Sequence, residues 1–160
     1  MKTTPKPSQI AILAGAAVML IFSFLDFVKS SSAFGGDVGF SAWDGDYFFP
    51  FSIFPLLFAL VVAGTTAATV FGAVKLPEPI LTLNWKQINF TLAFAGFVIL
   101  LGFLISGPDG LENGIGLYFS ILGAIAVLAG AVMELLGIEV GGSTGGGATP
   151  PAPGGPSTPF

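Results

Sequence analysis

The chain has 160 residues, of which 53% are hydrophobic and 9% are charged, and its mean hydropathy is +0.89. A soluble domain carries about 25% charged residues, and nine acids with five lysines cannot coat a water-soluble globule of this size. The net charge of −4 is scattered, which excludes a clustered basic face for nucleic acid. With no histidine and no cysteine, the sequence predicts no catalytic, metal or cofactor site, and we expect no enzyme activity.

Four stretches are long and apolar enough to cross a bilayer. They are residues 10–28, 51–74, 88–106 and 115–138. About 20 residues suffice, because a helix rises about 1.5 Å per residue and the hydrocarbon core is about 30 Å thick. Each stretch is predicted to be a helix, since backbone groups in lipid must bond within their own segment. The predicted fold is an all-α, four-helix transmembrane bundle of two hairpins over residues 1–140.

The first stretch has a second interpretation, as a cleaved secretory signal. Lys2 and Lys6 precede it, and small residues at 31–33 offer a cleavage site. We favour a retained helix, because the run is longer than a signal core and Asp26 and Lys29 intervene.

The lysines predict how the chain is threaded. Four of the five lie on one side if the N-terminus and the connection between the second and third helices are cytoplasmic: Lys2, Lys6, Lys75 and Lys86. The positive-inside rule favours that orientation. With four crossings, both termini are then cytoplasmic, and the predicted location is the plasma membrane.

Rows of small residues predict the contacts between the helices, because close backbone approach is what holds helices together in lipid. The rows are Ala59, Ala63 and Ala67, then Gly64, Ala68 and Gly72, then Gly116, Ser120 and Ala124, with Ala11 and Gly15 in the first helix. Thr65, Thr66, Thr69 and Asn89 are the notable polar groups within the spans. We interpret them as packing groups and not as the lining of a pore.

Charged groups at the helix ends have two interpretations. Asp26 could bind a proton or cation, or it could simply pair with Lys29 near the membrane surface. We favour the pair. Glu134 is a similar case at the other end of the bundle, where Lys75 or Lys86 is its expected neighbour.

The loop over residues 35–47 is the most distinctive exposed stretch and supplies the candidate partner contacts Trp43, Asp44 and Asp46. Two of its acids have the alternate spacing of a calcium loop, but the closing glutamate is missing. We therefore favour aromatic groups that lie on lipid headgroups or on a partner, with the acids left in water.

The last 20 residues, 141–160, are uncharged and rich in glycine and proline, so we predict a disordered tail. Pro150, Pro153, Pro156 and Pro159 recur every third residue, which is the period of a polyproline II helix. These four prolines are candidate partner contacts, although a solvated tail is the simpler interpretation.

The sequence resembles the small four-helix membrane proteins of unknown function that are common in actinobacteria. The resemblance rests on the Ser41-Ala42-Trp43-Asp44 element, the Lys75-Leu76-Pro77 connection and the Gly/Pro/Ala tail. It implies a four-helix topology and no particular activity. We expect a non-enzymatic accessory or scaffold protein whose partners are the lipid bilayer and another protein or a second copy. The alternative is a small transporter or channel.

Overall fold

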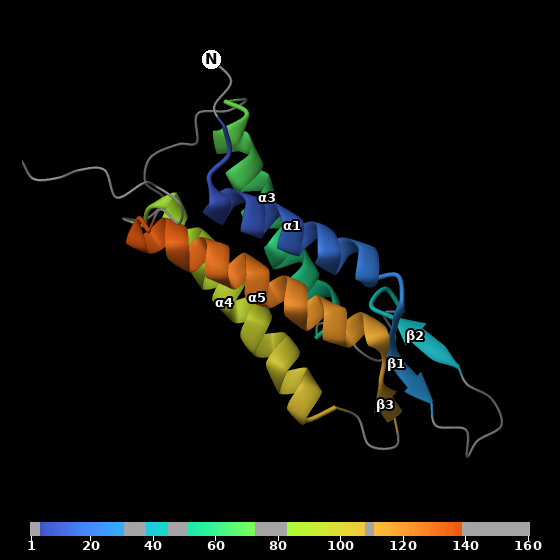
Figure 1. Ribbon diagram of the computed structural model, residues 1–160. Helices are drawn as coiled ribbons and strands as arrows, with labels where there is room; N and C mark the ends of the chain where they lie inside the picture. The colour runs from blue at the N-terminus through green and yellow to red at the C-terminus, as the bar shows by residue number, and fades with distance from the viewer. Residues whose placement is uncertain (1–3, 31–37, 45–50, 73–82, 108–110, 139–160) are drawn as a thin grey trace, which may run out of the picture.

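The computed structural model describes residues 4–30, 38–44, 51–72, 83–107 and 111–138. These residues form four helices that pack together and a small three-stranded sheet at one end of them (Figure 1). The helices are α1 (Pro7–Phe22), α3 (Ile53–Val70), α4 (Trp85–Ile105) and α5 (Ile115–Leu136). The strands are β1 (Asp26–Ser30), β2 (Gly39–Ser41) and β3 (Leu111–Asn113).

Three of the helices, α3, α4 and α5, are long and apolar enough to cross a membrane. They contain 18, 21 and 22 residues, whereas the apolar helix α1 contains 16. Large apolar side chains on all four helices are exposed, among them Ile21, Leu57, Phe94 and Leu122. Exposed apolar surface of this extent is suited to lipid and not to water. The chain is therefore a multi-pass membrane protein.

The prediction of one helix over residues 10–28 is wrong in its last third. α1 ends at Phe22, the hydroxyl of Ser23 donates to the carbonyl of Leu20 at 2.6 Å, and β1 begins at Asp26. A short apolar run fits a strand as well as a helix, and here the partners that complete its hydrogen bonds lie on β2 and β3. The all-α prediction is corrected to a mostly helical fold with a small sheet.

β1 is the central strand of an antiparallel sheet with the order β2-β1-β3. Val28 lies opposite Phe40 on one side and Asn113 on the other. The register shifts between Asp26 and Val28, so Phe27 and Val28 are both buried instead of alternating between faces. The sheet thereby adds two apolar side chains to the core at this end of the bundle.

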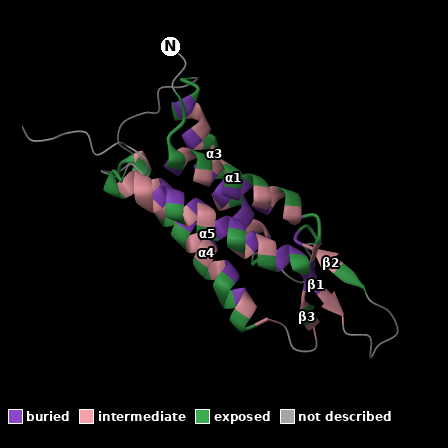
Figure 2. Ribbon diagram, viewed as in Figure 1, coloured by how far each residue is buried: buried purple, intermediate pink, exposed green. Residues whose placement is uncertain are grey.

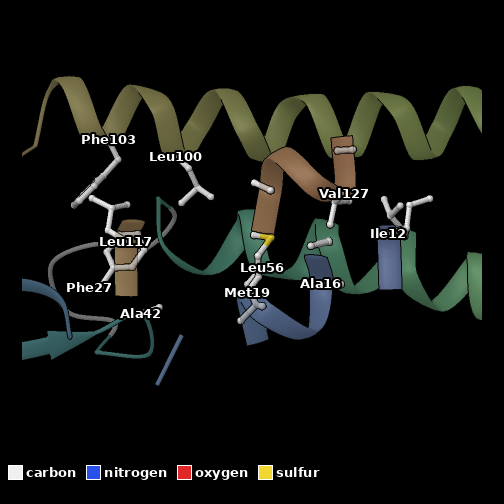
Figure 3. Close-up of a cluster of buried hydrophobic side chains, with 14 of the residues drawn as sticks. Ile12, Ala16, Met19, Phe27, Ala42, Leu56, Leu100, Phe103, Leu117 and Val127 are labelled. Carbon is white, nitrogen blue, oxygen red and sulfur yellow. The ribbon is translucent and has the colours of Figure 1, made fainter. Parts of the chain in front are cut away.

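The helices form a ring in which α1 and α4 each contact both α3 and α5. The buried side chains of α1, α3, α4 and α5 gather along the middle of the ring, as Figure 2 shows in purple. Figure 3 shows that this core continues to the sheet, where Phe27 and Leu117 lie close to Phe103. We call this end of the molecule the sheet end, and the opposite end, which carries Lys6, Lys86 and Glu134, the lysine end.

The closest helix contact is between α1 and α5, which lie side by side and antiparallel (Figure 1). Three glycines of α5 recur every seven residues, and a Cβ on each would lie 2.6–2.8 Å from a carbonyl oxygen of α1. The pairs are Gly116 with Phe22, Gly123 with Gly15 and Gly130 with Ser8. A seven-residue repeat on both helices keeps them in contact along their length, and the missing side chains let the backbones touch.

The predicted rows of small residues are confirmed in part. Gly116, Ser120, Ala124, Gly15 and Ala59 are buried at helix contacts. Gly64 and Gly72 of the second row are not contacts with the described helices, since both are exposed and a Cβ on either would meet nothing within 4 Å. Small residues at four-residue spacing mark a possible contact face, but only packing decides whether that face meets a helix or lipid.

Candidate functional sites at the two ends

At the sheet end, the structure connects the candidate residue Trp43 to the end of α1. The indole N–H of Trp43 donates to the hydroxyl of Ser23 at 2.9 Å, and its ring stacks on Phe24 with centroids 5.6 Å apart. The ring is 42% exposed and Phe24 is 65% exposed. The pair is an aromatic surface with one hydrogen-bonding edge, which is the arrangement that suits the interface between lipid and water.

The turn that carries Trp43 is tied to two helices through Ala42. The N–H of Ala42 donates to the carbonyl of Ser23 at 3.1 Å, and its carbonyl accepts from the hydroxyl of Ser52 at 2.9 Å. Asp44 closes the turn, because one of its carboxylate oxygens accepts the N–H of Ser41 at 2.6 Å. These bonds hold the turn against the end of α1 and the start of α3.

The other candidate contacts, Asp46 and Pro150, Pro153, Pro156 and Pro159, lie outside the described residues, as does Lys75. Asp26 and Lys29 do form the expected pair, with the carboxylate and ammonium 3.5 Å apart. They lie on β1 and not on a helix, and both side chains are nearly half exposed. Such a surface pair contributes little to stability, about 0–1 kcal/mol.

Replacing Ser23 with alanine is expected to release Trp43 from the end of α1. The substitution removes the acceptor of the indole N–H, so the ring should gain freedom and contact more water. We expect a red shift of Trp43 emission in a Trp85→Phe background, and a loss of about 1 kcal/mol in the free energy of unfolding. Ser41→Ala is a matched control, since among the described residues the Ser41 hydroxyl accepts from the backbone N–H of Trp43 and not from its indole. An unchanged spectrum for Ser23→Ala would contradict the assigned bond.

Inside the bundle, the polar residues nominated as packing groups lie toward the lysine end. The hydroxyl of Thr65 lies 2.9 Å from the side-chain oxygen of Asn89, which connects α3 to α4. The hydroxyl of Thr69 donates to the carbonyl of Thr66, one turn earlier. Thr66 is 2% exposed, and its hydroxyl has no hydrogen-bond partner among the described residues. Thr65 and Asn89 therefore join two helices, whereas Thr66 buries an unpaired polar atom.

Replacing Thr66 with valine is expected to stabilise the protein by about 1 kcal/mol, because the change keeps the shape and removes an unpaired buried hydroxyl. The neighbouring change Thr65→Val removes the contact with Asn89 and should destabilise the protein by about 0.6 kcal/mol. Reversible unfolding in mixed micelles measures both. A clear loss of stability in Thr66→Val would show that this hydroxyl is bonded in the membrane.

At the lysine end, a pocket lies between the first turns of α1 and α4 and the last turn of α5. It is lined by Lys6, Ser8, Gln9, Lys86, Met133 and Glu134, with Gly137 and Ile138 at its edge. The side chain of Gln9 hydrogen-bonds to the Glu134 carboxylate, and both lysines attract that carboxylate electrostatically. The expected neighbour Lys86 is thus present. Sequence reasoning missed Lys6 and Gln9, because the rows of small residues did not show which helix packs against α5.

No protein-family model, curated protein or solved structure matches the chain. The functional conclusion therefore depends on the chemistry of the described residues.

Proposed function

We propose that this chain is a non-enzymatic accessory or scaffold subunit of the plasma membrane. In this proposal it crosses the bilayer four times, both termini are cytoplasmic, and it acts through helix packing, its sheet-end loop and its Pro-rich tail. The resemblance to small four-helix actinobacterial membrane proteins agrees with this proposal and stays a prediction.

The packing of α1 supports a fourth crossing. α1 lies beside α5 from the contact of Ser8 with Gly130 to that of Phe22 with Gly116. Its 16 residues span about 24 Å, and Ser23 and the turn after it extend the chain to the sheet. A helix held against a membrane-spanning neighbour over this length should cross with it. The lysine end then faces the cytoplasm, because the positive-inside rule places lysines there.

The apolar centre of the bundle is the observation that carries the scaffold proposal. The large apolar side chains of α1, α3, α4 and α5 with the least exposure are Ile12, Met19, Leu56, Val62, Leu100, Leu117 and Val127, each at 2% or less, and Thr66 is the one polar residue among the described residues of these helices that is buried to the same degree. A small space between the helices is likewise lined by apolar side chains, including Met19, Ala59, Leu92 and Val127. Transport of a polar solute needs polar or charged groups along its path. A packed apolar centre instead suits a protein that binds others through its surface.

Two exposed features are available for such binding. Gly64 and Gly72 of the predicted small-residue row lie exposed on and just after α3, where a helix of another protein could approach closely. Trp43 and Phe24 offer an aromatic surface at the sheet end.

Gly64→Ile should weaken association within the membrane without lowering the stability of the protein itself. Gly102→Ile is the matched control, because Gly102 is also surrounded by open space but lies on α4.

A flux assay on purified protein in liposomes tests the proposal against its alternative, a small transporter or channel. Ion-sensitive dyes inside the vesicles report leakage, and gramicidin serves as the positive control. The scaffold proposal predicts that vesicles with and without the protein leak at the same rate. Robust flux that changes in Thr66→Val or Asn89→Ala would replace it with the transporter, since both residues are polar groups buried between the helices.

A further inference from the structure

The pocket at the lysine end combines charges of both signs in one small space. Lys6 precedes α1, Lys86 is the second residue of α4, and Glu134 lies in the last turn of α5. These side chains are far apart in the sequence and line one pocket only because three helix ends meet there (Figure 1). The lining therefore offers a place for a negative group beside the lysines and for a positive group beside Glu134.

Gln9 is a hydrogen-bonding neighbour of the Glu134 carboxylate, which is partly buried. The side-chain oxygen of Gln9 accepts the backbone N–H of Lys6 at 2.9 Å, which leaves its amide N–H groups to donate to the carboxylate. Glu134 is therefore held by a neutral donor and keeps acceptor capacity on its oxygens. A carboxylate in this state can accept hydrogen bonds from a ligand ammonium group.

The helix ends favour the same arrangement of charge. The first turns of α1 and α4 bring the positive ends of two helix dipoles to the pocket, beside Lys6 and Lys86. The last turn of α5 brings the negative end of a third, beside Glu134. An anionic group is thus favoured near the lysines, and a cationic group is favoured near Glu134.

The depth of the pocket identifies the source of such a ligand. Glu134 is two residues from the end of the apolar helix α5, and Trp85, an aromatic residue of the kind found at headgroup level, adjoins Lys86. The apolar side chain of Ile10 is exposed on the first turn of α1, and those of Leu136 and Ile138 are exposed at and just after the end of α5. A ligand here has its polar part among charges and its apolar part against lipid-facing side chains, which describes a membrane phospholipid.

We infer that this pocket binds the headgroup of phosphatidylethanolamine. Its phosphodiester lies beside Lys86 and Lys6, and its primary ammonium donates to the Glu134 carboxylate beside Gln9. Phosphatidylcholine fits less well, because its trimethylammonium has no N–H to donate. Phosphatidylglycerol supplies the phosphate without the cation. The inference needs only the membrane location of the chain and not the scaffold role.

The test uses the full chain in bilayers, with Trp85 as the reporter beside the pocket. The only other tryptophan is Trp43, so a Trp43→Phe protein reports from Trp85 alone. Lipids with brominated acyl chains quench a nearby indole, and competition with unbrominated lipid gives their relative affinity. We expect phosphatidylethanolamine to bind about tenfold more tightly than phosphatidylcholine or phosphatidylglycerol, a difference of about 1.4 kcal/mol. Equal quenching by the three lipids would overturn the inference.

Two substitutions test the contacts of the headgroup one at a time, the ammonium at Glu134 and the phosphate at Lys86. Glu134→Gln should abolish the preference over phosphatidylglycerol, and Lys86→Gln should weaken binding of both lipids. Glu112→Gln and Lys29→Gln make the same changes at the sheet end and should have no effect. A preference that survives Glu134→Gln would overturn the assignment of the ammonium. If either variant fails to fold, the lipid competition on the Trp43→Phe protein still decides. Displacement of the lipid by free phosphoethanolamine at a similar concentration would show that the ligand is a soluble one.

Discussion

Phe27→Ala is expected to lower the free energy of unfolding by about 3–5 kcal/mol, the range for removal of a fully buried phenylalanine. Phe27 is 1% exposed, although it lies on a strand at the end of the bundle, and its ring contacts that of Phe103 at 5.2 Å. The expected loss is large because β1, α4 and α5 close around this side chain and cannot readily refill its volume (Figure 3). Reversible unfolding in mixed micelles measures the change.

Phe24→Ala is the matched control, since it makes the same chemical change three residues earlier. Phe24 is 65% exposed and contacts the ring of Trp43, so its removal should cost about 1 kcal/mol or less. If residues 10–28 formed one continuous helix, these two side chains would not differ in this way. Similar losses for Phe24→Ala and Phe27→Ala would contradict the strand and the corrected end of α1.

Gly123→Ala is expected to destabilise the protein by about 1–3 kcal/mol, the usual cost of overfilling a packed interface. The added methyl group would lie 2.7 Å from the carbonyl oxygen of Gly15 and 2.6 Å from the side chain of Met19. Met19 can move, but the backbone of α1 cannot move without separating the two helices. Met19→Ala should therefore fail to rescue Gly123→Ala, and a larger residue at position 123 should disrupt the contact of α1 with α5.

Gly102→Ala is the control for this prediction, because a Cβ at Gly102 meets nothing within 4 Å. It should be neutral or slightly stabilising, since alanine favours a helix more than glycine does. Comparing the free energies of unfolding of Gly123→Ala and Gly102→Ala also checks whether the glycines at seven-residue spacing in α5 mark its contact with α1. Equal effects of Gly123→Ala and Gly102→Ala would show that α1 and α5 are not packed as described.

Much of the helical part of the fold could be predicted from the sequence. Three apolar runs gave helices whose ends lie within four residues of those observed, for instance 115–138 for α5 (Ile115–Leu136). Hydropathy and length suffice here because each run exceeds any strand that a sheet of this size could contain. The helix predicted over residues 10–28, the first run in the chain, is wrong from Ser23 onward, because hydropathy does not distinguish an apolar strand from the end of an apolar helix.

The contact between α1 and α5 could have been predicted more closely. Four-residue spacing selected Gly116, Ser120 and Ala124, which are buried, but also Gly64, which is exposed. The repeat of Gly116, Gly123 and Gly130 every seven residues is visible in the sequence and marks the closest contact. The partner helix α1 could not be identified in the same way. Its three residues that face these glycines are Ser8, Gly15 and Phe22, and only Gly15 is a glycine.

Of the candidate sites, the sequence predicted one residue at the sheet end and did not predict the pocket at the lysine end. Trp43 was nominated from its exposed, aromatic surroundings, and it is exposed, but its bond to Ser23 depends on where α1 ends. The pocket at the lysine end could not be predicted, because Lys6, Lys86 and Glu134 are brought together only by the packing of three helices.

The threading of the chain is the most direct test of the account, and the absence of cysteine from the sequence makes it simple. Single cysteines at Thr4, Val38 and Ile138, all exposed, can be labelled on intact cells with a maleimide that does not cross membranes. We expect Val38→Cys to react from outside, and Thr4→Cys and Ile138→Cys to react only after permeabilisation. Labelling of Thr4→Cys and Val38→Cys from the same side would show that α1 does not cross the membrane, and would contradict the four-crossing topology.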